Sequence, residues 1–118
     1  MNIQEVAQKL VNYCRQGQND QAINELYADN IVSLETKGSV TRNGIAEVLA
    51  ASAEWFQTVE EIHSFEVSEP MIAADFFVVT MTFDITFKER GRTKMSELAV
   101  YEVTDGKITF EEFFYAMP

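Results

Sequence analysis

The fold is decided by ten consecutive residues, LYADNIVSLE, which run from Leu26 to Glu35. The order of apolar and polar residues predicts a helix that ends at Ala28-Asp29 and continues directly into a β-strand. Glu35 stands at the far end of that strand and places a carboxylate there. Helical patterns dominate the first half of the chain and strand patterns dominate the second half, which indicates an α+β domain.

Three segments have the i, i+3, i+4 spacing of apolar residues that is typical of amphipathic helices. They are residues 3–14, 22–27 and 45–56. Gly17 is expected to end the first helix, because glycine tolerates the left-handed conformation found at helix C-termini. Asn19 or Asp20 is predicted to cap the second helix and Asn43 the third, since short polar side chains accept hydrogen bonds from the free N–H groups there.

From Glu60 onward, apolar residues alternate with a period of two, which predicts strands. The predicted strands are residues 62–67, 77–87, 95–103 and 108–116. The second of these has an unbroken apolar face, made of Phe77, Val79, Met81, Phe83, Ile85 and Phe87. Short turns at residues 88–93 and 104–107 join the last three strands, and short connections predict an antiparallel sheet.

Composition limits the possible functions. With 118 residues, 47% of them apolar and 24% charged, the chain is expected to form one domain, residues 1–118. The net charge of −10 disfavours nucleic acids and anionic membranes as partners. No apolar run suits a signal peptide or a membrane span. The single cysteine, Cys14, suits a cytoplasmic protein, and one Cys with one His disfavours a closed zinc site.

Three short motifs follow one another in a characteristic order. Residues 26–30 lead into a strand, Asn43-Gly44-Ile45 opens the third helix, and residues 103–108 (VTDGKI) precede the last strand. With these motifs, nearly the whole chain resembles the SnoaL-like branch of the nuclear transport factor 2-like superfamily. The resemblance implies a cone, in which a curved antiparallel sheet wraps around the three helices and encloses a pocket. It also implies a homodimer through the outer face of the sheet, which would cover Phe76 and Val78.

The superfamily hosts isomerases, polyketide cyclases, epoxide hydrolases, dehydratases and non-enzymatic binding modules. Its ketosteroid isomerases carry their general base at the position that Glu35 occupies here, and a carboxyl facing an apolar cavity is suited to proton transfer. The alternative for Glu35 is a strand end in water. The tyrosine of these isomerases would fall near Leu10 or Val11 and their second acid near Ala99, so neither of these positions carries the matching residue type here. The acid of the cyclases and epoxide hydrolases would fall at residues 113–115, where this chain has Phe-Phe-Tyr.

Three further residues are candidates for a catalytic site. His63, the only histidine, would shuttle protons if it faced the pocket, and would otherwise be a hydrogen-bonded residue beside the core. Glu97 lies mid-strand among apolar neighbours, which favours either a cavity or a partner surface. Tyr101 lies on the same strand face and would orient a substrate. With Glu35, these residues would suffice for acid–base chemistry on a carbonyl or an enol.

Large apolar side chains would form the ligand-binding wall of the pocket, although each also suits the core. The candidates are Trp55, Phe56, Met81, Phe83, Phe113 and Tyr115. On the last strand, Glu111 and Glu112 lie on opposite faces, and the sequence leaves open which of them points inward. The hairpin tip is basic, which is more typical of a solvated turn than of an anion site. Its basic residues are Lys88, Arg90, Arg92 and Lys94.

Three functional hypotheses follow. The first is a cofactor-independent acid–base enzyme (an isomerase, cyclase or dehydratase) for a small apolar organic substrate, with Glu35 as base and His63 or Glu97 as acid. The sequence contains no nucleotide-binding loop or metal-ligand motif, which favours such unaided chemistry. The second is a non-catalytic module that binds an apolar ligand or a partner protein. The third is a cone filled by its own aromatic residues, among them nine phenylalanines.

Overall fold

A computed structural model describes residues 1–116 and confirms an α+β fold of three helices and a seven-stranded sheet. The predicted domain, residues 1–118, extends beyond the described residues at its end. The helices are α1 (Ile3–Arg15), α2 (Asn19–Leu26) and α3 (Ile45–Thr58), with a short 3₁₀ turn, η1, at Thr36–Gly38. The strands are β1 (Tyr27–Glu35), β2 (Val40–Asn43), β3 (Val59–Val67), β4 (Met71–Ala73), β5 (Phe76–Phe87), β6 (Gly91–Thr104) and β7 (Lys107–Phe114).

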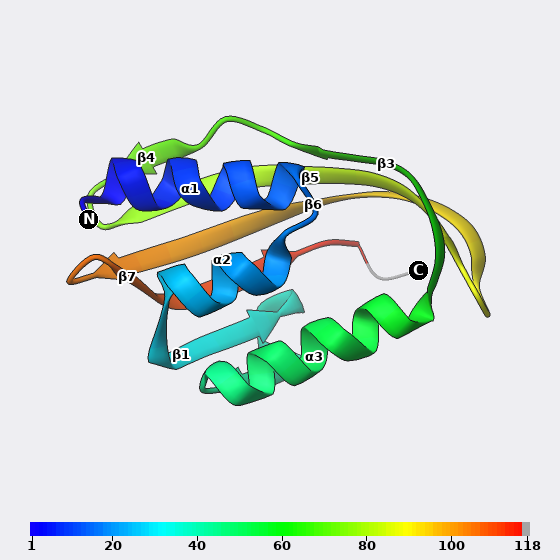
Figure 1. Cartoon of the computed structure of the whole chain (residues 1–118), viewed down its shortest axis with the longest axis horizontal. Coiled ribbons are helices and arrows are strands. Elements are labelled where there is room, and N and C mark those ends of the chain that lie inside the picture. The colour runs from blue at the N-terminus through cyan, green and yellow to red at the C-terminus, as the bar shows by residue number, and fades with distance from the viewer. Residues whose placement is uncertain (117–118) are drawn as a thin grey trace.

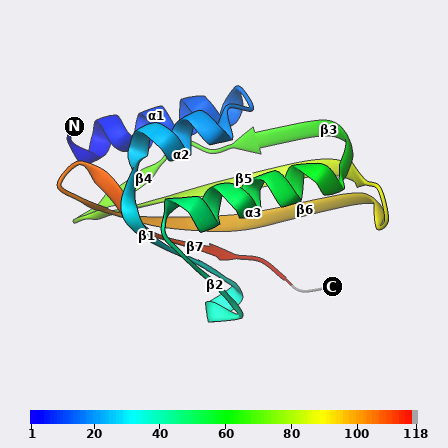
Figure 2. The same ribbon diagram turned by 60° about the horizontal axis from the view of Figure 1, so that its bottom comes forward.

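The helices cover one face of a curved sheet (Figure 1). Turning the molecule shows the long strands β5 and β6 curving past the helices as one extended hairpin (Figure 2). The side chains that are almost completely buried between the two layers include Leu10, Leu26, Ile31, Phe77 and Ile108. We call the sheet face toward the helices the inner face, and the opposite one the outer face.

Helix α1 follows its predicted stripe, and its buried residues are Val6, Ala7, Leu10, Val11 and Cys14. Asn2 and Glu5 form a capping box at its start, where the Glu5 N–H donates to Asn2 Oδ1 at 2.9 Å. The predicted cap of α2 was wrong. Asn19 and Asp20 lie inside that helix, and Gln18 precedes it without a side-chain hydrogen bond. No helix within residues 1–116 is long and apolar enough to cross a membrane.

The decisive stretch changes from helix to strand earlier than predicted. Helix α2 ends at Leu26, and Tyr27 is already extended, with φ −89° and ψ 142°. Tyr27 is the register partner of Ile108 in β7, so the chain joins the sheet at this residue instead of continuing the helix. Glu35 ends the strand, as predicted.

The strand order is β2-β1-β7-β6-β5-β3, and β4 pairs with the beginning of β5. The pairs β3–β5, β5–β6 and β6–β7 are antiparallel, as predicted. However, β1 pairs with β7 in parallel, so the prediction of a wholly antiparallel sheet was wrong there. That prediction relied on short turns, whereas most of the chain separates β1 from β7. The short strands β2 and β4 were not predicted.

Helix α3 begins without the predicted Asn43 cap. Asn43 is the last residue of β2, and the N-cap is Gly44, with φ 87°. This positive φ suits glycine, which has no Cβ to clash with the backbone. The start of the helix is supported from its own first turn instead, because the Asn43 N–H donates to the Glu47 carboxylate at 2.8 Å.

The alternation along β5 defines the two faces of the sheet. The buried residues of β5 are those predicted from the sequence: Phe77, Val79, Met81, Phe83, Ile85 and Phe87. On the outer face, Met71, Phe76 and Leu98 are 73%, 44% and 40% exposed. The inner face therefore supplies the core and the cavity described below, while the outer face keeps an uncovered apolar patch.

Candidate functional site

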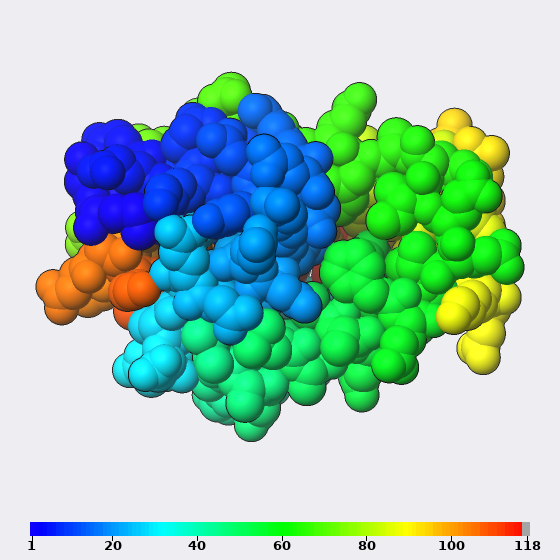
Figure 3. Space-filling model, in the orientation of Figure 1, coloured from blue at the N-terminus to red at the C-terminus, as the bar shows by residue number. Residues whose placement is uncertain are grey.

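A cavity of about 350 Å³ lies between the inner face of the sheet and the helices. Its walls come from all three helices and from inward-facing residues of strands that include β1, β5, β6 and β7. Figure 3 shows a hollow between α2 and α3 in the surface, and Asn19, Ser52 and Phe56 from these two helices line the cavity. The third hypothesis required the aromatic residues to fill the interior, and the cavity shows that they do not.

Every predicted site residue except His63 lines this cavity. The predicted catalytic residues that do so are Glu35, Glu97 and Tyr101. The predicted ligand-binding residues are Trp55, Phe56, Met81, Phe83, Phe113 and Tyr115. The fold thus brings together residues that are far apart in the sequence, while their roles remain predictions.

His63 lies outside the cavity, on the outer face of the sheet. Its Nε2 is hydrogen-bonded with Thr86 Oγ1 at 2.7 Å, and its Nδ1 lies 3.2 Å from Glu61 Oε2. Thr86 alternates with the buried residues of β5, so its side chain points outward. The pairing of β3 with β5 also shifts register at His63, between Ile62 and Ser64, which simple alternation cannot anticipate. The structure therefore corrects the expectation that His63 is part of the pocket.

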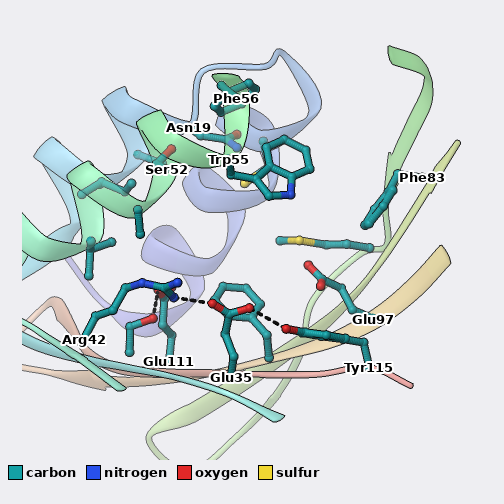
Figure 4. Close-up of a pocket in the computed structure, with 18 of the residues that line it drawn as sticks. Asn19, Glu35, Arg42, Ser52, Trp55, Phe56, Phe83, Glu97, Glu111 and Tyr115 are labelled. Atoms are coloured by element: carbon teal, nitrogen blue, oxygen red, sulfur yellow. Dashed lines mark hydrogen bonds and ion pairs between the residues drawn. The ribbon is translucent and has the colours of Figure 1, made fainter. Parts of the chain in front are cut away.

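Glu35 is held by two neighbours at the end of β1 (Figure 4). Arg42 of β2 donates to Glu35 Oε2 and forms an ion pair with it, and the Tyr115 hydroxyl donates to Glu35 Oε1 at 2.7 Å. Burial and the contact with Glu35 raise the pKa of Tyr115 to about 12, so its hydroxyl remains a donor at neutral pH. Both oxygens of Glu35 are therefore engaged by protein groups.

Glu111 of β7 is the most deeply buried carboxyl of the cavity, with 3% of its surface exposed. The Tyr27 hydroxyl donates to its Oε1, and Ser33 Oγ donates to its Oε2 at 2.7 Å. Burial raises the pKa of Glu111, and the two hydrogen bonds oppose that rise. Of the two glutamates left open by the sequence, Glu111 is the one that points inward.

Glu97 of β6 is a cavity carboxyl without a protein partner. Figure 4 shows its side chain near Glu35 and Tyr115, and it makes no hydrogen bond with any residue from 1 to 116. Burial, together with the negative charges of Glu35 and Glu111, raises the pKa of Glu97 to about 7. Both protonation states are therefore populated near neutral pH, as proton transfer requires.

Tyr101 places a hydroxyl in the same cavity. The side chain is 1% exposed, and its ring stacks on Phe77 with 4.7 Å between the centroids. Its hydroxyl makes no hydrogen bond within the described chain, where no fully buried polar atom lacks a partner, so the hydroxyl must reach open cavity space. Burial, and then the charge of Glu111, raise the pKa of Tyr101 well above its ordinary value, which keeps it protonated.

An aromatic wall formed around Trp55 faces these polar groups. The indole packs edge-on against Phe56, Phe83 and Phe87, at centroid distances of 5.0, 6.3 and 5.9 Å. Cys14 also lines the cavity, but burial raises the pKa of its thiol to about 12, which disfavours thiolate chemistry. Across residues 1–116, no three His, Cys, Asp or Glu side chains gather as a metal site would require.

The profile of the SnoaL-like domain family matches residues 1–115. The chain belongs to this family. The resemblance inferred from the sequence motifs is thereby confirmed. A solved SnoaL-like structure from Mesorhizobium loti, provisionally described as a polyketide cyclase and carbohydrate phosphatase, is 34% identical. It superposes with a TM-score of 0.86, covering 98% of this chain and 100% of the other.

More distant solved structures share the SnoaL-like fold. A protein from Jannaschia sp., also provisionally described as a SnoaL-like polyketide cyclase, is 15% identical with a TM-score of 0.77, covering 94% of this chain and 83% of its own. A protein from Catenulispora acidiphila with a ketosteroid isomerase-like fold, in complex with trimethylamine, is 16% identical with a TM-score of 0.76, covering 96% and 86%. No protein with a curated description matches the sequence.

The polar residues of this SnoaL-like pocket that escaped prediction include Tyr27, Ser33 and Arg42, as well as Asn19 and Ser52. Ser33 lies two residues from Glu35 on the same strand, so alternation alone places both side chains on one face. Tyr27 was assigned to a helix, and Arg42 lies on β2, a strand that the sequence pattern did not reveal. The pocket positions of Tyr27 and Arg42 could not be predicted without the correct secondary structure.

Proposed function

We propose that this SnoaL-like protein is a cofactor-independent acid–base enzyme that moves a proton on a small, mainly apolar organic substrate such as a ketone or an enol. The observation that carries this proposal is Glu97, a carboxyl in a cavity with an aromatic wall, without a partner in the described chain and with a pKa of about 7. The 34% identical relative, provisionally described as a polyketide cyclase, supports an enzymatic role.

Glu97, rather than Glu35, transfers the proton in this proposal, because both oxygens of Glu35 already accept hydrogen bonds. The Glu97 carboxylate takes a proton from the carbon beside a substrate carbonyl. The electrons of that C–H bond form the C=C bond of an enolate, and the carbonyl π electrons move to oxygen. Tyr101 donates a hydrogen bond to this oxygen as its charge develops. In a substrate with a C=C bond next to that carbon, the enolate is a dienolate, and Glu97 returns the proton to the far carbon of the C=C bond, which moves the double bond; without such a bond the proton returns to the same carbon, which gives exchange.

Hydrogen exchange at carbon tests this step without knowledge of the natural substrate. The protein is incubated in D₂O with a panel of small aryl ketones and β-diketones, and proton NMR follows the loss of the C–H signal beside the carbonyl. We expect Glu97→Gln to lower the exchange rate by about 100-fold or more, the usual share of a general acid–base group. The wild-type rate should rise with pH and level off above about 7, as Glu97 ionises.

Glu102→Gln is the matched control, because Glu102 lies on the same strand but pairs with Phe76 on the outer face. It should leave the exchange rate unchanged. If Glu97→Gln binds the probes and exchanges them as fast as the wild type, the enzymatic proposal fails. If the wild type binds the probes without exchange above the buffer rate, the second hypothesis, a non-catalytic binding module, is the better account.

We further propose that the protein works as a cytoplasmic homodimer joined through the outer face of the sheet. The exposed apolar side chains of Met71, Phe76 and Leu98 need covering, and the single reduced cysteine suits the cytoplasm. Sedimentation at micromolar concentration should show a dimer, and Leu98→Glu should convert it to a monomer. Val40→Glu alters an equally exposed residue away from this patch and should not. A monomeric wild type would refute the dimer.

A further inference from the structure

The charges of the cavity are unevenly balanced. Three glutamates line it, Glu35, Glu97 and Glu111, against two arginines, Arg42 and Arg90. Arg42 is committed to Glu35 by an ion pair. Arg90 is exposed at the hairpin between β5 and β6 and lies over the Phe87 ring. The interior therefore keeps more negative than positive groups, and a positive charge placed there would relieve the repulsion among the carboxylates.

Two polar groups in this interior are free to meet a ligand. Neither Glu97 nor the Tyr101 hydroxyl makes a hydrogen bond within residues 1–116. Tyr101 is 1% exposed, so its hydroxyl is an unpaired polar group at the bottom of the cavity, not a surface group. The hydroxyl reaches open cavity space, so it is able to hydrogen-bond with a polar group of a ligand placed there.

The opposite wall is suited to a cation. The π-face of an aromatic ring attracts a cation through the ring quadrupole, most strongly for tryptophan. Trp55, Phe83 and Phe87 all line the cavity. This wall already holds one cation, because the Arg90 guanidinium lies 4.1 Å from the ring centroid of Phe87. Aromatic faces opposite a carboxylate are the usual means of binding an organic ammonium group.

We propose that the cavity binds a small organic cation, a protonated or quaternary amine, between the carboxylate of Glu97 and the aromatic wall around Trp55. This inference rests on the proposed function in that it names the substrate class of the same pocket: a compound that carries an ammonium group. Binding of such a cation favours the ionised form of Glu97, so the ligand itself drives a proton off the carboxyl. At neutral pH a larger fraction of Glu97 is therefore in its ionised, basic form when the pocket is occupied than when it is empty.

Calorimetry with two matched probes tests the inference without requiring turnover. Choline carries a permanent positive charge, and 3,3-dimethylbutan-1-ol is its neutral isostere, in which carbon replaces nitrogen. We expect choline to bind at least about tenfold more tightly at pH 7, since cation–π and ion-pair contacts are lost with the charge. Titration in two buffers of different ionisation enthalpy should show release of up to about half a proton per choline at pH 7, and none at pH 9.

Variants locate the effect. Glu97→Gln should abolish the proton release and weaken choline binding about tenfold, while leaving the neutral isostere unaffected. Glu102→Gln, on the outer face, should change neither. Equal affinity for the two probes, no binding of choline, or proton release that persists in Glu97→Gln would each overturn the inference. The exchange assay on neutral ketones does not depend on these results, so failure of cation binding and failure of the acid–base step can be told apart.

Discussion

Glu97→Gln should make the protein more stable at pH 8, by about 3 kcal/mol, although it removes a candidate catalytic group. The pKa of Glu97 rises from 4.5 to about 7 in the folded protein. Each unit corresponds to about 1.4 kcal/mol of difference between the two protonation states. The ionised carboxylate is therefore a cost that the folded protein bears at high pH and that the neutral amide of glutamine avoids.

The sign of this effect follows from proton linkage. Because the folded pKa lies above the unfolded value, the folded state binds the proton more tightly, and its stability falls as pH rises from about 4.5 through 7. The advantage of Glu97→Gln should be absent at pH 4 and complete at pH 8. Urea unfolding at both pH values measures it, with Glu102→Gln as control. A variant as stable as the wild type at pH 8 would show that Glu97 is well hydrated.

Much of the fold was predictable because burial follows local periodicity. The stripe of α1 and the alternation of β5 each repeat over enough residues to determine which side faces the core. The parallel pairing of β1 with β7 was not predictable in the same way. It joins the strand of the decisive stretch to the last strand of the chain, and no local pattern encodes the partner of a strand so distant in sequence.

The candidate site shows the same limit at the level of single residues. Glu97 and Tyr101 flank the buried Ala99 at two-residue spacing on a regular strand, so alternation placed them on one face, but the sequence left open whether that face points into a cavity or toward a partner. His63 lies at a register shift in β3, between Ile62 and Ser64, which breaks alternation at that residue. Arg42 stands on a short strand that follows the 3₁₀ turn, where Lys37 has a positive φ, and such a turn has no clear sequence pattern.

The three carboxyls of the pocket differ in what surrounds them, and this difference separates their roles. Glu35 has a cationic partner, Glu111 has two neutral donors, and Glu97 has no partner in the described chain. Placing carboxyls in unlike environments is how one site keeps one acid ionised while another exchanges protons. The donors on Glu111 therefore influence Glu97 as well, since the charge of Glu111 contributes to the raised pKa of Glu97.

Tyr27→Phe should destabilise the protein by about 2 to 3 kcal/mol at pH 8, because it leaves a buried carboxylate short of a donor. Tyr27 is 7% exposed and Glu111 3% exposed, so water cannot easily replace the lost hydroxyl. The loss should shrink at low pH, where Glu111 is protonated and needs fewer donors. The substitution should also lower the pKa of Glu97. Without the Tyr27 donor, Glu111 is protonated more readily, and its charge then repels the Glu97 carboxylate less.

Tyr13→Phe provides the matched control for the buried pair. It also removes a tyrosine hydroxyl that donates to a glutamate, Glu25, but that carboxylate is 38% exposed and keeps its contact with Lys9 at 3.0 Å. Its effect on unfolding should be much smaller than that of Tyr27→Phe, since a solvated acceptor finds water instead. Urea unfolding of both variants at pH 5 and pH 8 gives the comparison. Equal losses for the two tyrosines would mean that Glu111 is hydrated through the cavity, and the buried network would then not control the charge that Glu97 experiences.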